Sequence, residues 1–201
     1  MISASIFFGA VSSTDTGKKT NRIHLPKNIT PTLKLSKTSY VYNGKAQKPT
    51  VAVYDGKTKL DASNYTVSYA NGRKAVGTYK VTVTLKGNYS GTGTASFKIT
   101  KAAQPMKVAT KAKTVKLNKV KKSAQTVTGA ITVTKPQGTV SYTKVAKGSD
   151  KNMTINKKNG KIVVKKGTKK GKHKLIVNVK AAGNANYKAL TKKVTVTITV
   201  K

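Results

Sequence analysis

The sequence contains no cysteine, no tryptophan and no glutamate. Without cysteine, neither a disulfide framework nor thiolate chemistry is available, which fits a secreted protein held by packing and equally a cytosolic one. Without tryptophan, and with only 37% hydrophobic residues, the core must be built mostly from valine, isoleucine, leucine and tyrosine. This composition favours thin sandwiches over one large globule.

Side chains that could carry catalysis are also few. The acidic residues and histidines are Asp15, Asp55, Asp61, Asp150, His24 and His173. They are scattered along the chain, so no carboxylate pair, nucleophile–base pair or cluster of zinc or calcium ligands is evident. His173 lies between two lysines in a basic loop that enters a strand, and we expect its side chain to be exposed. The sequence therefore predicts a protein that is not an enzyme, with no catalytic, metal or cofactor site.

The N-terminal segment differs from the rest of the chain. Its first 11 residues include a short apolar stretch, but no basic residue precedes it as a signal peptide requires. A damaged or truncated signal peptide, the mis-assigned start of a gene fragment and a plain disordered terminus all stay open. Residues 12–32 are rich in serine, threonine, lysine and asparagine, so residues 1–32 are predicted to be a flexible leader. No run of 18 apolar residues occurs, and we expect no transmembrane span.

From Leu33 onward, apolar and polar residues alternate. The clearest runs are residues 65–69, 79–85, 95–99 and 194–200. Because successive side chains of a strand point to opposite faces, each run predicts a half-buried strand. Turn signals recur about every 8–12 residues, as in sandwiches, and Asn159-Gly160 between two apolar runs predicts a hairpin. No segment shows a helical period, so the expected fold class is all-β.

Two parts of the chain end in the same way. A strand at residues 79–85 leads to a Gly/Asn turn carrying Tyr89 and then to a closing strand, and residues 175–179 lead to a similar turn carrying Tyr187. Two copies of one supersecondary plan predict two modules. Each tyrosine could bond a backbone group through its hydroxyl, as in the tyrosine corner of immunoglobulin-like folds, or simply pack beside its turn.

The modules are predicted at residues 33–100 and 106–201. The linker between them, residues 101–105, is short, so we expect an elongated, semi-rigid pair that is monomeric.

Several motifs resemble those of a known family. The first module contains YVYNGKAQKPTVAVYDG at residues 40–56, NYTVSYANG at 64–72, AVGTY at 75–79 and KGNYSGT at 86–92. These resemble the Ig-like repeats of Gram-positive secreted and cell-surface proteins. INKKNGK at residues 155–161, VKKG at 164–167 and AAGNANYK at 181–188 resemble a module found beside such repeats. Asn64 stands where aspartate is common, and Lys86-Gly87 shortens a glycine-rich motif.

The resemblance implies two tandem immunoglobulin-like β-sandwich modules in an extracellular, cell-wall-associated protein. Such modules serve as stalks, spacers and carriers of adhesive or enzymatic domains. The family has no catalytic residues to transfer to this chain, and it implies no cofactor.

Positive charge is the strongest functional signal. Lysine and arginine total 41 against four acidic residues, a net charge of +37, and only Arg22 and Arg73 are arginine. A strongly basic chain is drawn to polyanions in a salt-dependent way. Lysine is a hydrated point charge without the bidentate geometry of arginine. The composition thus favours non-specific attraction to an anionic matrix over sequence reading.

Runs of lysine near the start of the second module and in two predicted hairpins are candidate polyanion-binding residues. They are Lys119, Lys121, Lys122, Lys157, Lys158, Lys161, Lys165, Lys166, Lys169, Lys170, Lys172 and Lys174. Possible partners are wall teichoic acid, membrane lipid head groups and acidic host glycans. A solvated face that only keeps the chain soluble is an equally weighted alternative.

The sequence is compatible with four functions to different degrees. The leading hypothesis is a structural or adhesive spacer, and the second is a dedicated carbohydrate or wall-polymer binding module using lysines and the exposed tyrosines Tyr40, Tyr42 and Tyr54. A non-specific nucleic-acid binder is favoured only by charge, since arginine and basic–aromatic interleaving are missing. An enzyme ranks last.

Overall fold

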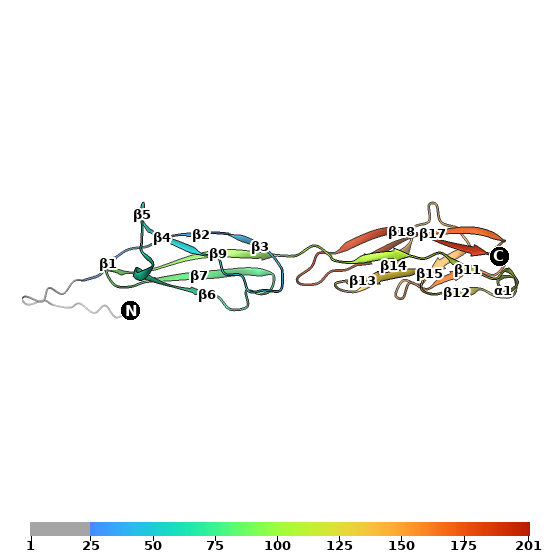
Figure 1. The fold of residues 1–201 in the computed structure, drawn as a ribbon, viewed down its shortest axis with the longest axis horizontal. Helices are drawn as coiled ribbons and strands as arrows, with labels where there is room; N and C mark the ends of the chain where they lie inside the picture. The colour runs from blue at the N-terminus through green and yellow to red at the C-terminus, as the bar shows by residue number, and fades with distance from the viewer. Residues whose placement is uncertain (1–24) are drawn as a thin grey trace, which may run out of the picture.

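The computed structural model of the protein describes residues 25–201 (Figure 1). The signal-like stretch, residues 1–24 of the predicted leader, and His24 lie outside the described residues.

The first sandwich is built from strands β1 to β9. Its larger sheet has the order β3 (Ser39–Val41), β9 (Thr92–Thr100), β7 (Gly77–Leu85) and β6 (Tyr65–Tyr69). Facing it is a sheet of β2 (Thr32–Leu35), β4 (Val51–Asp55) and β5 (Thr58–Lys59). A short 3-10 helix, Ala62–Asn64, precedes β6, and β1 (Lys27–Asn28) pairs in parallel with β8 (Tyr89–Ser90). Between the layers lie Val53, Leu60, Val81, Val83, Leu85, Phe97 and Ile99, all buried.

The second sandwich repeats this plan with strands β10 to β18. Its larger sheet has the order β11 (Lys113–Val115), β18 (Leu190–Val200), β17 (Gly171–Ala181) and β14 (Val140–Lys144). The facing strands are β12 (Gln125–Val127), β16 (Ile162–Val164) and β15 (Met153–Ile155), with β10 (Lys107–Thr110) paired to β13 (Ile131–Thr134). One helix, α1 (Leu117–Lys122), follows β11. The core includes Met153, Ile162, Leu175, Val177, Val196 and Ile198.

The expected all-β fold of two tandem sandwiches is confirmed. The four alternating runs lie in β6, β7, β9 and β18, and inward side chains are buried at every second position from Leu175 to Ala181 in β17 and from Val196 to Val200 in β18. The hairpin at Asn159-Gly160 is also confirmed, because β15 and β16 pair antiparallel on either side of it. The shared ending is real: β7 pairs antiparallel with β9, as β17 does with β18.

Two expectations need correction. The sequence predicted no helix, but α1 forms over six residues, which is too short to show a repeating apolar pattern. The flexible leader was expected to reach residue 32, yet residues 25–32 include β1, and Ile29 packs against the first core. Pro31 is buried as well, so apolar side chains extend the folded part upstream.

The two sandwiches lie end to end (Figure 1), and the linker between them pairs with the backbone of the second. The amide of Ala102 donates to the carbonyl of Asn186, and the amide of Lys188 donates to the carbonyl of Ala102, both at 2.9 Å. From the first sandwich, the amide of Val76 donates to Oδ1 of Asn186 at 3.1 Å. The rings of Tyr42 and Tyr187 meet edge to face at 5.4 Å between centroids. The linker is therefore hydrogen-bonded to the second sandwich, and side chains of both sandwiches meet at the junction.

Candidate functional site

Three segments distant in sequence meet at the end of the second sandwich that points away from the first. They are residues 116–122 with α1, residues 165–172 between β16 and the start of β17, and Lys201 after β18; together we call them the distal tip (Figure 1). The amide of Gly167 donates to the carbonyl of Val120 at 3.0 Å. The amide of Leu117 donates to the carbonyl of Lys201 at 2.8 Å. Backbone hydrogen bonds therefore fix all three segments against one another.

Helix α1 places its lysines outward because two apolar residues hold it down. Val120 is completely buried, and Leu117, one turn earlier, packs partly buried against the same core. Residues three apart share a helix face, so the remaining side chains of α1 face solvent. They are Asn118, Lys119, Lys121 and Lys122, all exposed.

The segment between β16 and β17 is held by Thr168, whose side chain is only 2% exposed. Its hydroxyl donates to the carbonyl of Lys165 at 2.6 Å. Gly167 has a φ of +78°, a left-handed conformation that glycine adopts most readily. The sequence predicted a hairpin here, which is wrong, because β16 and β17 belong to different sheets. The segment crosses the end of the sandwich and so comes to lie beside α1.

The distal tip concentrates lysine without acidic partners. Its lysines, all exposed, are Lys116, Lys119, Lys121, Lys122, Lys165, Lys166, Lys169, Lys170, Lys172 and Lys201. Over residues 25–201 the ion pairs are Lys27 with Asp55 and His173 with Asp150, so none involves a lysine of the tip. Summed like charges of this kind create an attractive potential for anions.

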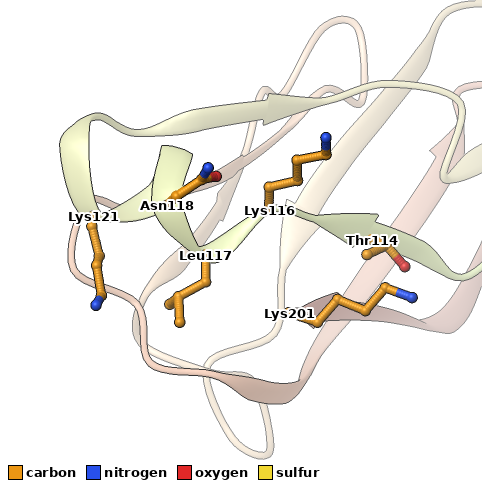
Figure 2. A pocket seen from close by; sticks show the side chains of 6 residues that line it. All are labelled: Thr114, Lys116, Leu117, Asn118, Lys121 and Lys201. Atoms are coloured by element: carbon orange, nitrogen blue, oxygen red, sulfur yellow. The ribbon is translucent and has the colours of Figure 1, made fainter.

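An open pocket of about 760 Å³ lies beside α1 within this tip. The residues that line it are Thr114, Lys116, Leu117, Asn118, Lys121 and Lys201 (Figure 2). Figure 2 shows the side chain of Leu117 between those of Lys121 and Lys201. The pocket thus combines cationic, hydrogen-bonding and apolar groups.

The structure divides the twelve lysines proposed from sequence. Eight of them lie in the distal tip: Lys119, Lys121, Lys122, Lys165, Lys166, Lys169, Lys170 and Lys172. Lys157, Lys158 and Lys161 belong instead to the β15–β16 turn, which lies at the far end of β16 from the tip because Val164, not Ile162, leads into it. Lys174 lies further along β17, opposite Thr197. Lys201, which lines the pocket, was missed because only the β11–β18 pairing brings it there.

The expectation that His173 is exposed is wrong. Its side chain is 11% exposed, with Nδ1 2.6 Å from Oδ2 of Asp150 and Nε2 2.8 Å from the carbonyl oxygen of Lys169. Both partners are acceptors, so both ring nitrogens must donate, and this requires the imidazolium form. The hydrogen bond with Asp150 raises the pKa of His173 and, from the other side, lowers the pKa of Asp150. The pair anchors the Lys169 part of the tip.

We expect this pair to make stability depend on pH. A raised His173 pKa contributes stability below the unfolded value of about 6.5, and that contribution is lost as pH rises through the folded pKa. A lowered Asp150 pKa contributes above the unfolded value of about 3.9 and is lost as pH falls through the folded pKa. Both contribute between those values, so unfolding by denaturant should show stability declining above pH 6.5 in the natural chain.

The variant His173→Gln should lose most stability near pH 5–6 and progressively less toward pH 9. His24→Gln, at the chain's other histidine, is the matched control. A gap between His173→Gln and the natural chain that stays constant over this range would contradict the charged pair.

Neither tyrosine singled out for a corner bonds through its hydroxyl within residues 25–201. Tyr89 is half-buried against the first core, and Tyr187 packs edge to face on Tyr42 at the junction. The hydroxyls that reach backbone belong to Tyr69, which donates to the carbonyl of Pro49 at 2.7 Å, and Tyr79, near the carbonyls of Gly72 and Ala75. Packing beside a turn therefore describes Tyr89 and Tyr187.

The tyrosines suggested as a carbohydrate-binding face are engaged elsewhere. Tyr40 packs edge to face on Phe97, with ring centroids 5.6 Å apart, and Tyr42 packs on Tyr187. The ammonium of Lys34 lies over the ring of Tyr54, 5.0 Å from its centroid. They do not form one free aromatic surface.

The chain matches no protein-family model, and no curated protein matches it. Among solved structures it is similar to the extracellular domain of protocadherin gamma B4, with 11% identity and a TM-score of 0.41 over 85% of this chain and 33% of that one. It is also similar to Sidekick-1 immunoglobulin domains 1–4, with 10% identity and a TM-score of 0.42 over 85% of this chain and 48% of that one. The similarity to human protocadherin-24 EC1-2 has 12% identity and a TM-score of 0.38 over 85% of this chain and 98% of that one.

The chain spans about a third to a half of the length of the first solved structures that it matches. At TM-scores below 0.5, the similarities carry no argument about family or function. None of the helices in the described part of the chain has the length and apolar character needed to cross a bilayer. Residues 25–201 contain no cluster of three metal-ligating side chains.

Proposed function

We propose that this chain is a non-catalytic extracellular spacer whose distal tip attaches to anionic polymers. In this proposal, modules at residues 33–100 and 106–201, joined by residues 101–105, form the rod, and the lysines of the tip make the attachment. The supporting observation is the gathering of ten lysines from three segments at the end facing away from the first sandwich. A Gram-positive wall polymer such as teichoic acid, or an acidic host glycan, has the required charge.

The chemistry of the tip favours a flexible polyanion over a nucleic acid read by sequence. All its cations are lysines, which act as point charges and lack the bidentate fork that reads guanine edges. Attraction of this kind weakens with salt, because the Debye length falls from about 10 Å at 0.1 M to about 3 Å at 1 M.

Retention on a matrix carrying poly(glycerol phosphate) tests the proposal, with a neutral dextran matrix as reference. Replacing Lys122, Lys166 and Lys170 of the tip by glutamine should weaken binding about tenfold or more at low salt, since each lysine near an anionic surface contributes about 1 kcal/mol. The matched variant replaces Lys157, Lys158 and Lys161 and removes the same charge from the β15–β16 turn.

The matched variant should lose clearly less. Equal losses for the two triple variants would show that net charge, and not the tip, governs binding. Undiminished retention at about 0.5 M salt, where screening is strong, or equal retention on dextran, would rule out polyanion attachment.

A further inference from the structure

The pocket beside α1 is lined by apolar and hydrogen-bonding side chains as well as by lysines. Its volume of about 760 Å³ falls within the range of roughly 300–1,000 Å³ typical of small-molecule sites, and a bare phosphate ion would fill little of it. Leu117 provides an apolar surface, and Thr114 and Asn118 provide a hydroxyl and an amide. A ligand that uses all of these carries anionic groups, carbon atoms and hydroxyls together.

The order of the lining residues suggests how such a ligand lies. Lys121 and Lys201 lie on opposite sides of Leu117 with their ammonium groups pointing away from it, and Lys116 lies between Asn118 and Thr114 (Figure 2). A polymer in which phosphates alternate with short polyols can place phosphates near Lys121 and Lys201. A polyol between these phosphates then lies on Leu117, in the pocket that Asn118 and Thr114 also line.

In the first sandwich, the position that corresponds to Leu117 is occupied by Tyr42 and contacts the second sandwich. The amide of Tyr42 donates to the carbonyl of Thr100, as that of Leu117 donates to the carbonyl of Lys201. In the first sandwich this position is covered, because Tyr42 packs on Tyr187 of the second. In the second sandwich, Leu117 lines an open pocket. The same corner of the fold therefore presents a large side chain in both, covered by Tyr187 in the first sandwich and open in the second.

We propose that this pocket binds a short stretch of a polyol-phosphate polymer, with a polyol on Leu117 and phosphates at the surrounding lysines. This inference rests on the proposed attachment of the tip to anionic polymers, and adds selectivity for the polyol. Polyphosphate, which has the charges but no carbon, should be held by the lysines alone.

The experiment compares a short oligo(glycerol phosphate) with a polyphosphate of the same number of phosphates, using the full chain at fixed low salt. Two variants report on the pocket. Leu117→Ser removes the apolar surface, and Asn118→Ala removes an exposed amide without touching the core. Each should weaken the glycerol phosphate oligomer by about three- to fivefold, as loss of a modest apolar contact or one hydrogen bond predicts, and leave polyphosphate affinity unchanged.

Because Leu117 also packs on the core, the unfolding midpoint of Leu117→Ser is measured alongside, and Asn118→Ala carries the test if that variant is unfolded. Loss confined to the glycerol phosphate oligomer supports the inference. Equal weakening of both oligomers, or no weakening of either, overturns the polyol site and leaves attachment by the tip standing. Failure of both oligomers to bind the natural chain overturns attachment as well.

Discussion

Replacing Gly138 by alanine should lower the free energy of unfolding of the second sandwich by about 2–5 kcal/mol, from left-handed strain and overpacking together. Gly138 has a φ of +81°, and a Cβ there would lie 1.9 Å from the carbonyl oxygen of Gly183. The obstacle is backbone, which cannot rotate away as a side-chain end can. Residues 183–188 would have to move, and they include Asn186 and Tyr187, which contact the first sandwich.

Gly167→Ala is the matched control for that substitution. Its φ of +78° is nearly the same, but nothing lies within 4 Å of an added Cβ. It should therefore cost only the conformational strain, about 1–2 kcal/mol. Denaturant unfolding measures the loss of unfolding free energy in both variants. Equal losses would show that the close approach of Gly138 to Gly183 does not affect stability.

Replacing Leu175 by alanine should destabilise the second sandwich by about 2–5 kcal/mol. Leu175 is completely buried in the middle of that core, so the truncated side chain leaves a cavity that its neighbours cannot fill. For a sandwich of this size, the melting temperature should fall by roughly 10–25 °C. The first sandwich has its own core clusters, and its transition should stay in place.

Scanning calorimetry measures both transitions in one experiment. Val83→Ala, at a completely buried position of the first sandwich, should move the other transition instead. If each substitution instead shifts a single transition of the whole chain, the two sandwiches unfold as one cooperative unit.

Local sequence patterns were enough to predict the all-β fold and its main strands. The strands β6, β7, β9 and β18 each bury one face, so alternation along the sequence reflects their environment directly. Helix α1 was missed because it is held by only two apolar residues, Leu117 and Val120, whose burial depends on strands remote in sequence. The same holds for β1, which is two residues long and exists because β8 pairs with it.

The site could be predicted only in part, because charge is visible in a sequence but its placement is not. Lys157 and Lys165 are close in sequence, yet strand β16 separates them toward opposite ends of the sandwich. Lys121 and Lys201 are 80 residues apart and line one pocket. His173 looked like one more exposed basic residue, since Asp150, which determines its environment, lies 23 residues away.

The parallel pairing of an early strand with the last one gives the molecule a mechanical property. In each sandwich the chain enters at one end, and the early strand, β3 or β11, runs beside the departing strand, β9 or β18, toward the other end. Tension applied through the two ends of the chain pulls these neighbours past each other along their length. Their ladder hydrogen bonds, which are evenly spaced and slanted between parallel strands, are loaded in shear and share the load instead of opening one at a time. A chain folded this way keeps its length under load until the short ladders β3·β9 and β11·β18 yield.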